Sequence, residues 1–563
     1  MCPQHDAPLG EPRVSTSAAG AAAPQEPRLD AGMKHHDHYA QQLPPWRNAL
    51  RQKLIPIVRW ETPYLALLQE QVRTPALDSY FAYTANLGTH TFFMITLPIL
   101  FWCGYTSVAR ATVHMLASGV FWSGFVKDML CLPRPLSPPL YRITMSGSAA
   151  LEYGFPSTHS TNAVSVALYA IQMLRSAPDQ HHPNVYFALQ LLFYFYAISI
   201  VLGRLYCGMH GFFDVVIGSF LGALLALCQL AFGDMFDFWL TGGTSLNLAV
   251  SVLVVLVLVR IHPEPADDCP CFDDSVAFAG VVIGIQVGAW HFSRTSFSTD
   301  YPIPSTVLFN LNEIGLVKTA LRTVFGVVII FLWRATMKPA LLKTLPPMFR
   351  LLEQARLNLP RAFFLNASKY TIIPQLRGDD NVIPSASEVP QMLKNLAHPR
   401  KRSVSVGPQS AADAYETLAY RNRRRRESIS SLDGAVPEEA SWSPIAKGNE
   451  ANSSGQVPLG ADLLPTPIAS RVHSYEHMMG SGGTTAPITP PMTAMDLPGD
   501  LVQSPLEAEN EKRQIFMLLT KPRVRYDVEV VTKLIVYAGI AWLAVEGNPI
   551  LFELCGLGMG VRR

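Results

Sequence analysis

The stretch GRLYCGMHGFFD, residues 203–214, places three polar side chains between two long apolar segments. His210 and Asp214 are four residues apart, so on a helix they would share one face. The carboxylate can then accept a hydrogen bond from one ring nitrogen of the histidine, which leaves the other nitrogen unprotonated and nucleophilic. The spacing therefore favours His210 as a covalent nucleophile that Asp214 orients.

Cationic side chains occur in the same stretch and in FVKDMLCLPRP, residues 125–135. Arg204 comes from the first stretch, and Lys127 and Arg134 come from the second. Arginine offers planar two-donor contacts that match phosphate, and lysine adds a point charge. The three residues together predict a binding site for a compact dianion such as a phosphoryl group.

A third polar stretch, YGFPSTHS at residues 153–160, has the composition of a helix start. Ser157 and Thr158 would offer hydroxyls and backbone N–H groups where the helix dipole favours an anion. His159 can protonate a departing alkoxide. With the residues above, the set comprises a nucleophile, its orienting group, an acid and an anion site.

These residues suit phosphomonoester hydrolysis through a phosphohistidine. The cations take the role that Mg²⁺ fills in other phosphoryl-transfer sites, and no carboxylate cluster is available to hold that ion. We therefore expect a reaction that needs no metal and no cofactor.

The elements that position these side chains must be membrane helices. The chain of 563 residues is 49% hydrophobic and only 16% charged, whereas soluble chains carry about a quarter charged residues. A helix that crosses a bilayer needs roughly 20 apolar residues. Candidate spans lie at 82–104, 107–127, 160–176, 185–203, 211–232, 242–260, 275–292, 315–334 and 529–547.

The polar stretches lie at matching ends of these spans. The second span ends at Lys127, the third begins at His159, the fourth ends at Arg204 and the fifth begins after His210. Because consecutive spans alternate in direction, all four ends reach the same membrane face. The sequence therefore predicts an all-α polytopic bundle of about 8–9 transmembrane helices whose polar residues gather at one surface.

The remaining regions follow from composition. The expected organisation is a disordered tail at 1–43, an interfacial segment at 44–81, a catalytic core at 82–232, additional spans at 233–350, a mostly disordered insertion at 351–525 and a hydrophobic end at 526–563. A net charge of +2 indicates no nucleic-acid partner.

The insertion carries the basic runs HPRKRSVSVG (398–407) and RNRRRRESISS (421–431), which look like protein kinase sites although most of the segment is typical of a solvated linker. If every span crosses once, the amino terminus and the insertion share the catalytic face. A cytosolic insertion fits the kinase sites, whereas the sequons at Asn366 and Asn452 are usable only in the lumen. We expected a miscounted or re-entrant span between 292 and 350.

The stretch DDCPCFDD, residues 267–274, contains Cys269 and Cys271. Two cysteines without a second pair are poor evidence for zinc. The pattern favours a tight loop or local pairing of these cysteines over a metal site.

Three motifs carry a family resemblance: K-x6-R-P with Lys127 and Arg134, P-S-x-H with Ser157 and His159, and R-x5-H-x3-D from Arg204 to Asp214. In this order and spacing they resemble the signature of the type 2 phosphatidic acid phosphatase superfamily.

Residues 59–93 and 262–284 look like fungal sphingoid long-chain-base phosphate phosphatases, and the likeness covers roughly 44–335. The resemblance implies a nucleophilic His210 and an active site in the lumen of the endoplasmic reticulum. Two positions depart from the superfamily pattern. Gly203 stands where serine is usual, which removes a hydroxyl, and Thr158 stands where glycine is common, which adds one.

The sequence therefore predicts a membrane lipid phosphatase that acts on sphingoid base 1-phosphates. Alternatives are a broader lipid or isoprenoid phosphatase acting on lysophosphatidate, phosphatidate or dolichyl diphosphate, and a non-catalytic lipid-phosphate binder or transporter. A vanadium haloperoxidase shares this kind of anion site, but membrane embedding argues against it.

Overall fold

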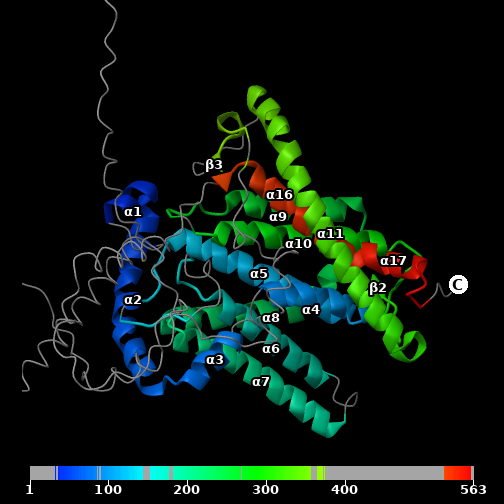
Figure 1. Ribbon diagram of the computed structural model, residues 1–563, viewed down its shortest axis with the longest axis horizontal. Coiled ribbons are helices and arrows are strands. Elements are labelled where there is room, and N and C mark those ends of the chain that lie inside the picture. Colours follow the sequence, from blue (N-terminus) through cyan, green and yellow to red (C-terminus); the bar gives the residue numbers. More distant parts are fainter. Residues whose placement is uncertain are drawn as a thin grey trace, which may run out of the picture. The chain divides into compact units, whose positions relative to one another are not determined.

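The computed structural model describes residues 32, 36–84, 87, 90–137, 139–143, 152–176, 182–267, 269–356, 364–371, 373 and 525–559. Within them, helices dominate and the strands are two residues long (Figure 1). The helices are α1 (His36–Gln42), α2 (Pro45–Val72), α3 (Pro75–Thr84), α4 (His90–Trp102), α5 (Thr106–Leu130), α6 (Thr158–Ser176), α7 (Pro183–Tyr206), α8 (Phe212–Thr241), α9 (Ser245–Ile261), α10 (Cys271–Phe292), α11 (Leu311–Gln354), the 3-10 helix η4 (Ala367–Lys369), α16 (Val528–Trp542), the π-helix η6 (Leu543–Gly547) and α17 (Asn548–Leu554). The strands are β1 (Ser298–Thr299), β2 (Thr306–Val307), β3 (Phe364–Leu365) and β4 (Arg525–Tyr526).

Each of the nine predicted spans contains a helix of this set. Among the described residues, α7, α8, α10, α11 and the unit from α16 to α17 are long and apolar enough to cross a bilayer, and α4 and α9 are shorter apolar helices. Helices α5 and α6 are more polar because they carry residues of the predicted site on their inner faces. The all-α multi-pass architecture is therefore confirmed.

Helix α10 lies at the centre of one half of the bundle and packs against α5 and α16 (Figure 1). Most of its residues are buried, and its apolar side chains join those of α4, α5 and η6 in the largest hydrophobic cluster. Helices α7, α8 and α9 instead expose large apolar side chains over much of their length. In a soluble protein such a surface would be costly, so these faces are suited to lipid.

Glycines set the separation of α6 and α8, the two helices that begin at the site. A Cβ atom at Gly218 of α8 would lie 2.6 Å from the carbonyl oxygen of Ser157, and one at Gly222 would collide with that of Thr161. The Thr161 hydroxyl also donates to the Gly218 carbonyl over 2.9 Å. The absence of side chains at these glycines lets α8 hold the start of α6 in place.

The carboxyl end of α5 is closed by arginines of α2. Arg47 donates to the carbonyl of Met129 over 2.8 Å, and Arg51 donates to that of Cys131 over 3.2 Å. These contacts satisfy carbonyl groups that a helix end leaves unpaired. Segment 44–81 thus forms helices tied to the end of α5, where Lys127 lies.

Residues 292–350 contain no re-entrant pair of helices in the described structure. A hairpin of β1 and β2 precedes α11, which is one long helix with a kink at Gly315 near its start. A single helix accounts for the apolar segment, so the described residues show no re-entrant pair here, and the number of spans stays a prediction.

Strands β3 and β4 pair in parallel across the predicted insertion, most of which lies outside the described residues. Arg525 of β4 donates to the carbonyl of Cys269 and lies 3.3 Å from Asp273, at the start of α10. Both ends of the insertion therefore reach the membrane face to which the Lys127 end of α5 belongs.

Candidate active site

Four helix ends meet as the sequence predicted. Lys127 near the end of α5 donates to the hydroxyl of Thr158 at the start of α6, over 2.9 Å. Arg134, from the loop after α5, lies 3.2 Å from His210, which stands between α7 and α8. Contacts across the chain therefore link all three polar stretches into one buried cluster.

The ring of His210 is held in one orientation from both sides. Its Nδ1 atom lies 2.9 Å from the carbonyl oxygen of Gly154, which can only accept, so Nδ1 carries the proton. Nε2 then has the free electron pair, and it faces the Nη1 donor of Arg134 at 3.2 Å. Burial, and the charges of Arg134 and Lys127, hold the pKa of His210 well below its ordinary value of 6.5. The neutral ring therefore presents a nucleophilic Nε2 to the cations.

Asp214 lies beside the ring of His210 but beyond hydrogen-bond distance, whereas the spacing predicted a direct hydrogen bond. Its Oδ2 atom lies 3.7 Å from Nδ1 of His210 and accepts a hydrogen bond from the Gly211 N–H over 2.8 Å. The carboxylate thus caps the start of α8 and places a negative charge beside the ring. The direct hydrogen bond that we expected from the spacing is made by Gly154 instead.

Two of the three cations share a carboxylate that sequence reasoning missed. Nζ of Lys127 lies 2.8 Å from Oε2 of Glu152, and Nη2 of Arg134 lies 3.8 Å from the same oxygen. Arg134 also donates through Nε to the Glu152 carbonyl over 3.0 Å. The side chains of Lys127 and Arg134 are 3% and 4% exposed and that of Glu152 is 22% exposed, so Glu152 is the most exposed member of this group.

Arg204 completes the set of cations. Its side chain is buried, and its Nε donor has no hydrogen-bond partner among the described residues. Its charge contributes, with that of Lys127, to the lowered pKa of His210. A buried guanidinium donor without an acceptor is costly, and an anion in the pocket would supply one.

The start of α6 is placed as predicted, with a difference at Ser157. The N–H of Ser157 donates to the Asp214 carbonyl over 3.0 Å, and its hydroxyl lies 3.0 Å from that of Ser160. Ser157 therefore braces α6 against α8 in this state. His159 is half-buried, and its charge acts on His210, which places the two histidines in one electrostatic cluster.

Glu61 of α2 is a further residue that the patterns did not single out. It accepts from the N–H of Phe213 over 2.9 Å, and burial raises its pKa. Glu152 is close in sequence to Ser157 and His159, whereas Glu61 is far from every motif, so no signal in the sequence pointed to Glu61.

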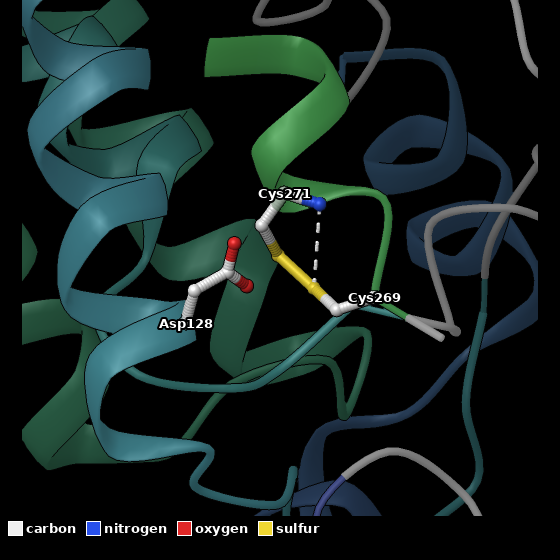
Figure 2. Close-up of side chains that lie close together, drawn as sticks. All are labelled: Asp128, Cys269 and Cys271. Atoms are coloured by element: carbon white, nitrogen blue, oxygen red, sulfur yellow. Dashed lines mark hydrogen bonds between the residues drawn. A yellow bond between two sulfur atoms is a disulfide. The ribbon is translucent and has the colours of Figure 1, made fainter. Parts of the chain in front are cut away.

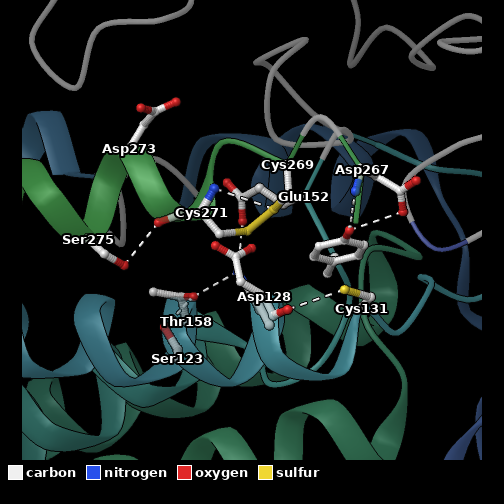
Figure 3. Close-up of a disulfide and its surroundings, with 12 residues drawn as sticks. Ser123, Asp128, Cys131, Glu152, Thr158, Asp267, Cys269, Cys271, Asp273 and Ser275 are labelled. Carbon is white, nitrogen blue, oxygen red and sulfur yellow. Dashed lines mark hydrogen bonds and ion pairs between the residues drawn. A yellow bond between two sulfur atoms is a disulfide. The ribbon is translucent and has the colours of Figure 1, made fainter. Parts of the chain in front are cut away.

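Cys269 and Cys271 form a disulfide, which confirms the predicted local pairing. Figure 2 shows the carboxylate of Asp128 facing the two sulfur atoms, and their ligand atoms lie within 4.8 Å of one another. A metal would need both sulfurs as thiolates, and here each is bonded to the other. Figure 3 shows Glu152 and Thr158 in the surroundings of this disulfide, which closes a tight loop at the start of α10.

The described geometry is a bundle of helices, several of them long and apolar enough to cross a membrane, that surrounds a buried histidine with arginine and lysine, an arrangement suited to a membrane-bound phosphatase. The family model of the PAP2 superfamily matches residues 107–236, which include every predicted site residue. The chain is 44% identical over 313 residues to a dihydrosphingosine 1-phosphate phosphatase of Schizosaccharomyces pombe, an overlap of 55% of this chain and 74% of that protein. It is 33% identical over 316 residues to a dihydrosphingosine 1-phosphate phosphatase of Saccharomyces cerevisiae, an overlap of 56% and 76%.

A more distant relative is sphingosine-1-phosphate phosphatase 2 of Homo sapiens, 27% identical over 282 residues, which are 49% of this chain and 68% of that protein. No solved structure matches. The chain belongs to the PAP2 superfamily. It is accordingly a phosphoric monoester hydrolase, as the three motifs predicted.

Proposed function

We propose that the protein hydrolyses sphingoid base 1-phosphates, such as dihydrosphingosine and phytosphingosine 1-phosphate, to the free base and inorganic phosphate. The two fungal relatives, which match this chain over 74% and 76% of their own length, are named dihydrosphingosine 1-phosphate phosphatases. The observation that carries the catalytic part is the Nε2 atom of His210, which holds a free electron pair among three buried cations.

In the first step, Nε2 of His210 attacks phosphorus. The bond from phosphorus to the lipid oxygen breaks, and its electron pair leaves with that oxygen, which takes a proton from His159. Asp214 stabilises the positive charge that develops on the ring. The products are the free sphingoid base and a phosphohistidine.

In the second step, water gives a proton to His159, and the oxygen of that water bonds to phosphorus. The phosphorus–nitrogen bond breaks, and the electron pair returns to Nε2 of His210. Inorganic phosphate leaves, and His159 is again protonated.

The phosphoryl oxygens are held by Lys127, Arg134 and Arg204, together with the start of α6 at Ser157 and Thr158. Preorganised donors of this kind stabilise charge without reorganising during the reaction. Nη1 of Arg134, which faces Nε2 of His210 in the unliganded state, moves to a phosphoryl oxygen when substrate enters.

The protein is a multi-pass membrane protein. We further propose that it resides in the endoplasmic reticulum and that the pocket faces the lumen. The resemblance of the three motifs to the superfamily signature, and of residues 59–93 and 262–284 to the fungal phosphatases, implies this location.

Phosphate release from a panel of lipids tests the function. The purified protein in detergent with EDTA should release phosphate from dihydrosphingosine 1-phosphate, and His210→Ala should release none. His114→Ala, a half-buried histidine far along α5 from the pocket, is the matched control and should retain activity.

Three outcomes would contradict the proposal. Activity that survives in His210→Ala would remove the assigned nucleophile. A wild-type protein that hydrolyses only dolichyl diphosphate or phosphatidate would assign the site to another lipid, and one that releases no phosphate at all would be a binder.

A further inference from the structure

Glu152 is an unexpected residue for a pocket that binds a dianion. Its carboxylate lies 2.8 Å from Nζ of Lys127 and 3.8 Å from Nη2 of Arg134, so it competes with a phosphoryl group for both cations. Figure 3 shows it between the loop that follows α5 and the start of α10. A negative charge here weakens phosphate binding unless the substrate also brings a positive charge.

The backbone around Glu152 is firmly fixed. Arg134 donates to the Glu152 carbonyl, Tyr153 donates through its hydroxyl to Asp267 over 3.0 Å, and the N–H of Gly154 donates to Leu132 over 3.0 Å. The backbone of Glu152 is therefore held in place by residues 132, 134 and 267. Its side chain remains 22% exposed, whereas that of Lys127 is 3% exposed, so the carboxylate is the more accessible of the two partners.

Sphingoid base 1-phosphates carry a primary amine on the carbon next to the one that bears the phosphate ester. Like a lysine side chain, this amine is protonated at neutral pH. Phosphatidate and lysophosphatidate have an ester or hydroxyl oxygen at that position and no positive charge. An ammonium group so close to the phosphate needs an acceptor at the border of the phosphate pocket.

We propose that Glu152 recognises the ammonium group of the substrate and thereby selects sphingoid bases over other lipid phosphates. The inference rests on the proposed function. When substrate binds, the phosphoryl oxygens take the donors of Lys127 and Arg134, and the carboxylate released from them pairs with the ammonium. Ion pairs are exchanged, so neither Glu152 nor the cations are left buried without a partner. A substrate without the amine leaves the carboxylate unpaired and is disfavoured.

The test compares two substrates and two proteins. The substrates are dihydrosphingosine 1-phosphate and its N-acetylated form, which lacks the charge, and the proteins are wild type and Glu152→Gln. For wild type, N-acetylation should lower kcat/KM at least tenfold. Glu152→Gln should lower kcat/KM at least tenfold for the amine substrate but should not lower it for the acetylated one, which, like inorganic phosphate, gains from the loss of the competing carboxylate.

Competition by inorganic phosphate provides a second measurement, in which the variant should bind more tightly than wild type. Phosphate has no ammonium group, so removal of the competing carboxylate should make it bind several-fold more tightly to Glu152→Gln than to wild type. A damaged fold cannot produce tighter binding. Glu264→Gln, a half-buried glutamate of the loop before α10, is the matched control and should behave as wild type.

Each other outcome overturns the inference. Equal losses for both substrates in Glu152→Gln would assign the residue to positioning Lys127 or Arg134, and no loss for either would remove it from recognition. If wild type releases no phosphate from dihydrosphingosine 1-phosphate, the proposed function itself fails, and the inference falls with it.

Discussion

Replacing Asp214 with asparagine separates the two interactions at Nδ1 of His210. The carboxylate lies 3.7 Å from this nitrogen, whereas the carbonyl of Gly154 lies 2.9 Å from it. In Asp214→Asn, the amide oxygen can still accept from the Gly211 N–H, and Gly154 still holds the proton on Nδ1. The variant therefore loses a negative charge beside the ring while Nε2 remains the nucleophile.

The magnitude follows from the separation of the charges. The ring is neutral before attack and positively charged in the phosphohistidine, so the carboxylate stabilises the transition state more than the ground state. Two unit charges 3.7 Å apart attract by about 4 kcal/mol at an effective dielectric constant of about 20. Since about 1.4 kcal/mol corresponds to a tenfold change in rate, kcat should fall about a thousandfold, with KM little changed.

The assay is steady-state phosphate release by the purified variant in detergent, with kcat and KM obtained separately. Asp234→Asn, an exposed aspartate on the same helix α8, is the control and should stay within about twofold of wild type. Loss of all activity, as in His210→Ala, would refute the conclusion that Gly154 holds the ring. Wild-type kcat would show that Asp214 contributes no transition-state stabilisation.

Two further predictions concern the nucleophile and the helix that positions it. Because the pKa of His210 is lowered, its neutral form persists below pH 6.5, and the acid limb of the kcat/KM profile should lie below that pH. The titration of the substrate phosphate, followed by phosphorus NMR, must first be divided out of the profile. An acid limb at or above pH 6.5 that is assigned to this histidine would contradict the burial argument. Gly218→Ala should destabilise the protein by about 1–3 kcal/mol and reduce kcat, because the added Cβ lies 2.6 Å from the Ser157 carbonyl oxygen. Thermal unfolding of this variant beside Ser219→Ala measures the effect, and equal stability of the two would show that α8 has room to move.

The membrane helices and the gathering of the motifs were predictable because both depend on simple periodic constraints. Apolar length marks a span, and alternation of direction brings the ends near Lys127, His159, Arg204 and His210 to one face. The structure adds the contacts that close the cluster, such as Lys127 with Thr158 and Arg134 with His210. Such contacts follow once the helix ends are known.

The partners supplied by irregular segments were not predictable. The Gly154 carbonyl fixes the ring of His210, yet a backbone group leaves no mark in a sequence pattern. Glu152 and Glu61 approach the site through a loop and through a helix far away in the chain, and no spacing rule connects them to the motifs. The i, i+4 spacing predicted that Nδ1 of His210 donates directly to Asp214, but the carboxylate lies 3.7 Å away and accepts from the Gly211 N–H.

The parallel pairing of β3 with β4 links the membrane side of residues 374–524 to the membrane side of the active site. Residues 374–524 leave and rejoin the described structure at adjacent points on the active-site face, and their sequence holds no apolar run long enough to cross a bilayer. We therefore predict that Asn452, Ser428 and His210 belong to one compartment. A glycan found on Asn452 would assign catalysis to the lumen and put the serines beyond cytosolic kinases. A phosphate found on Ser428 would instead assign catalysis to the cytosol. One mass spectrum of the purified protein therefore tests both the side of the active site and the side of the insertion.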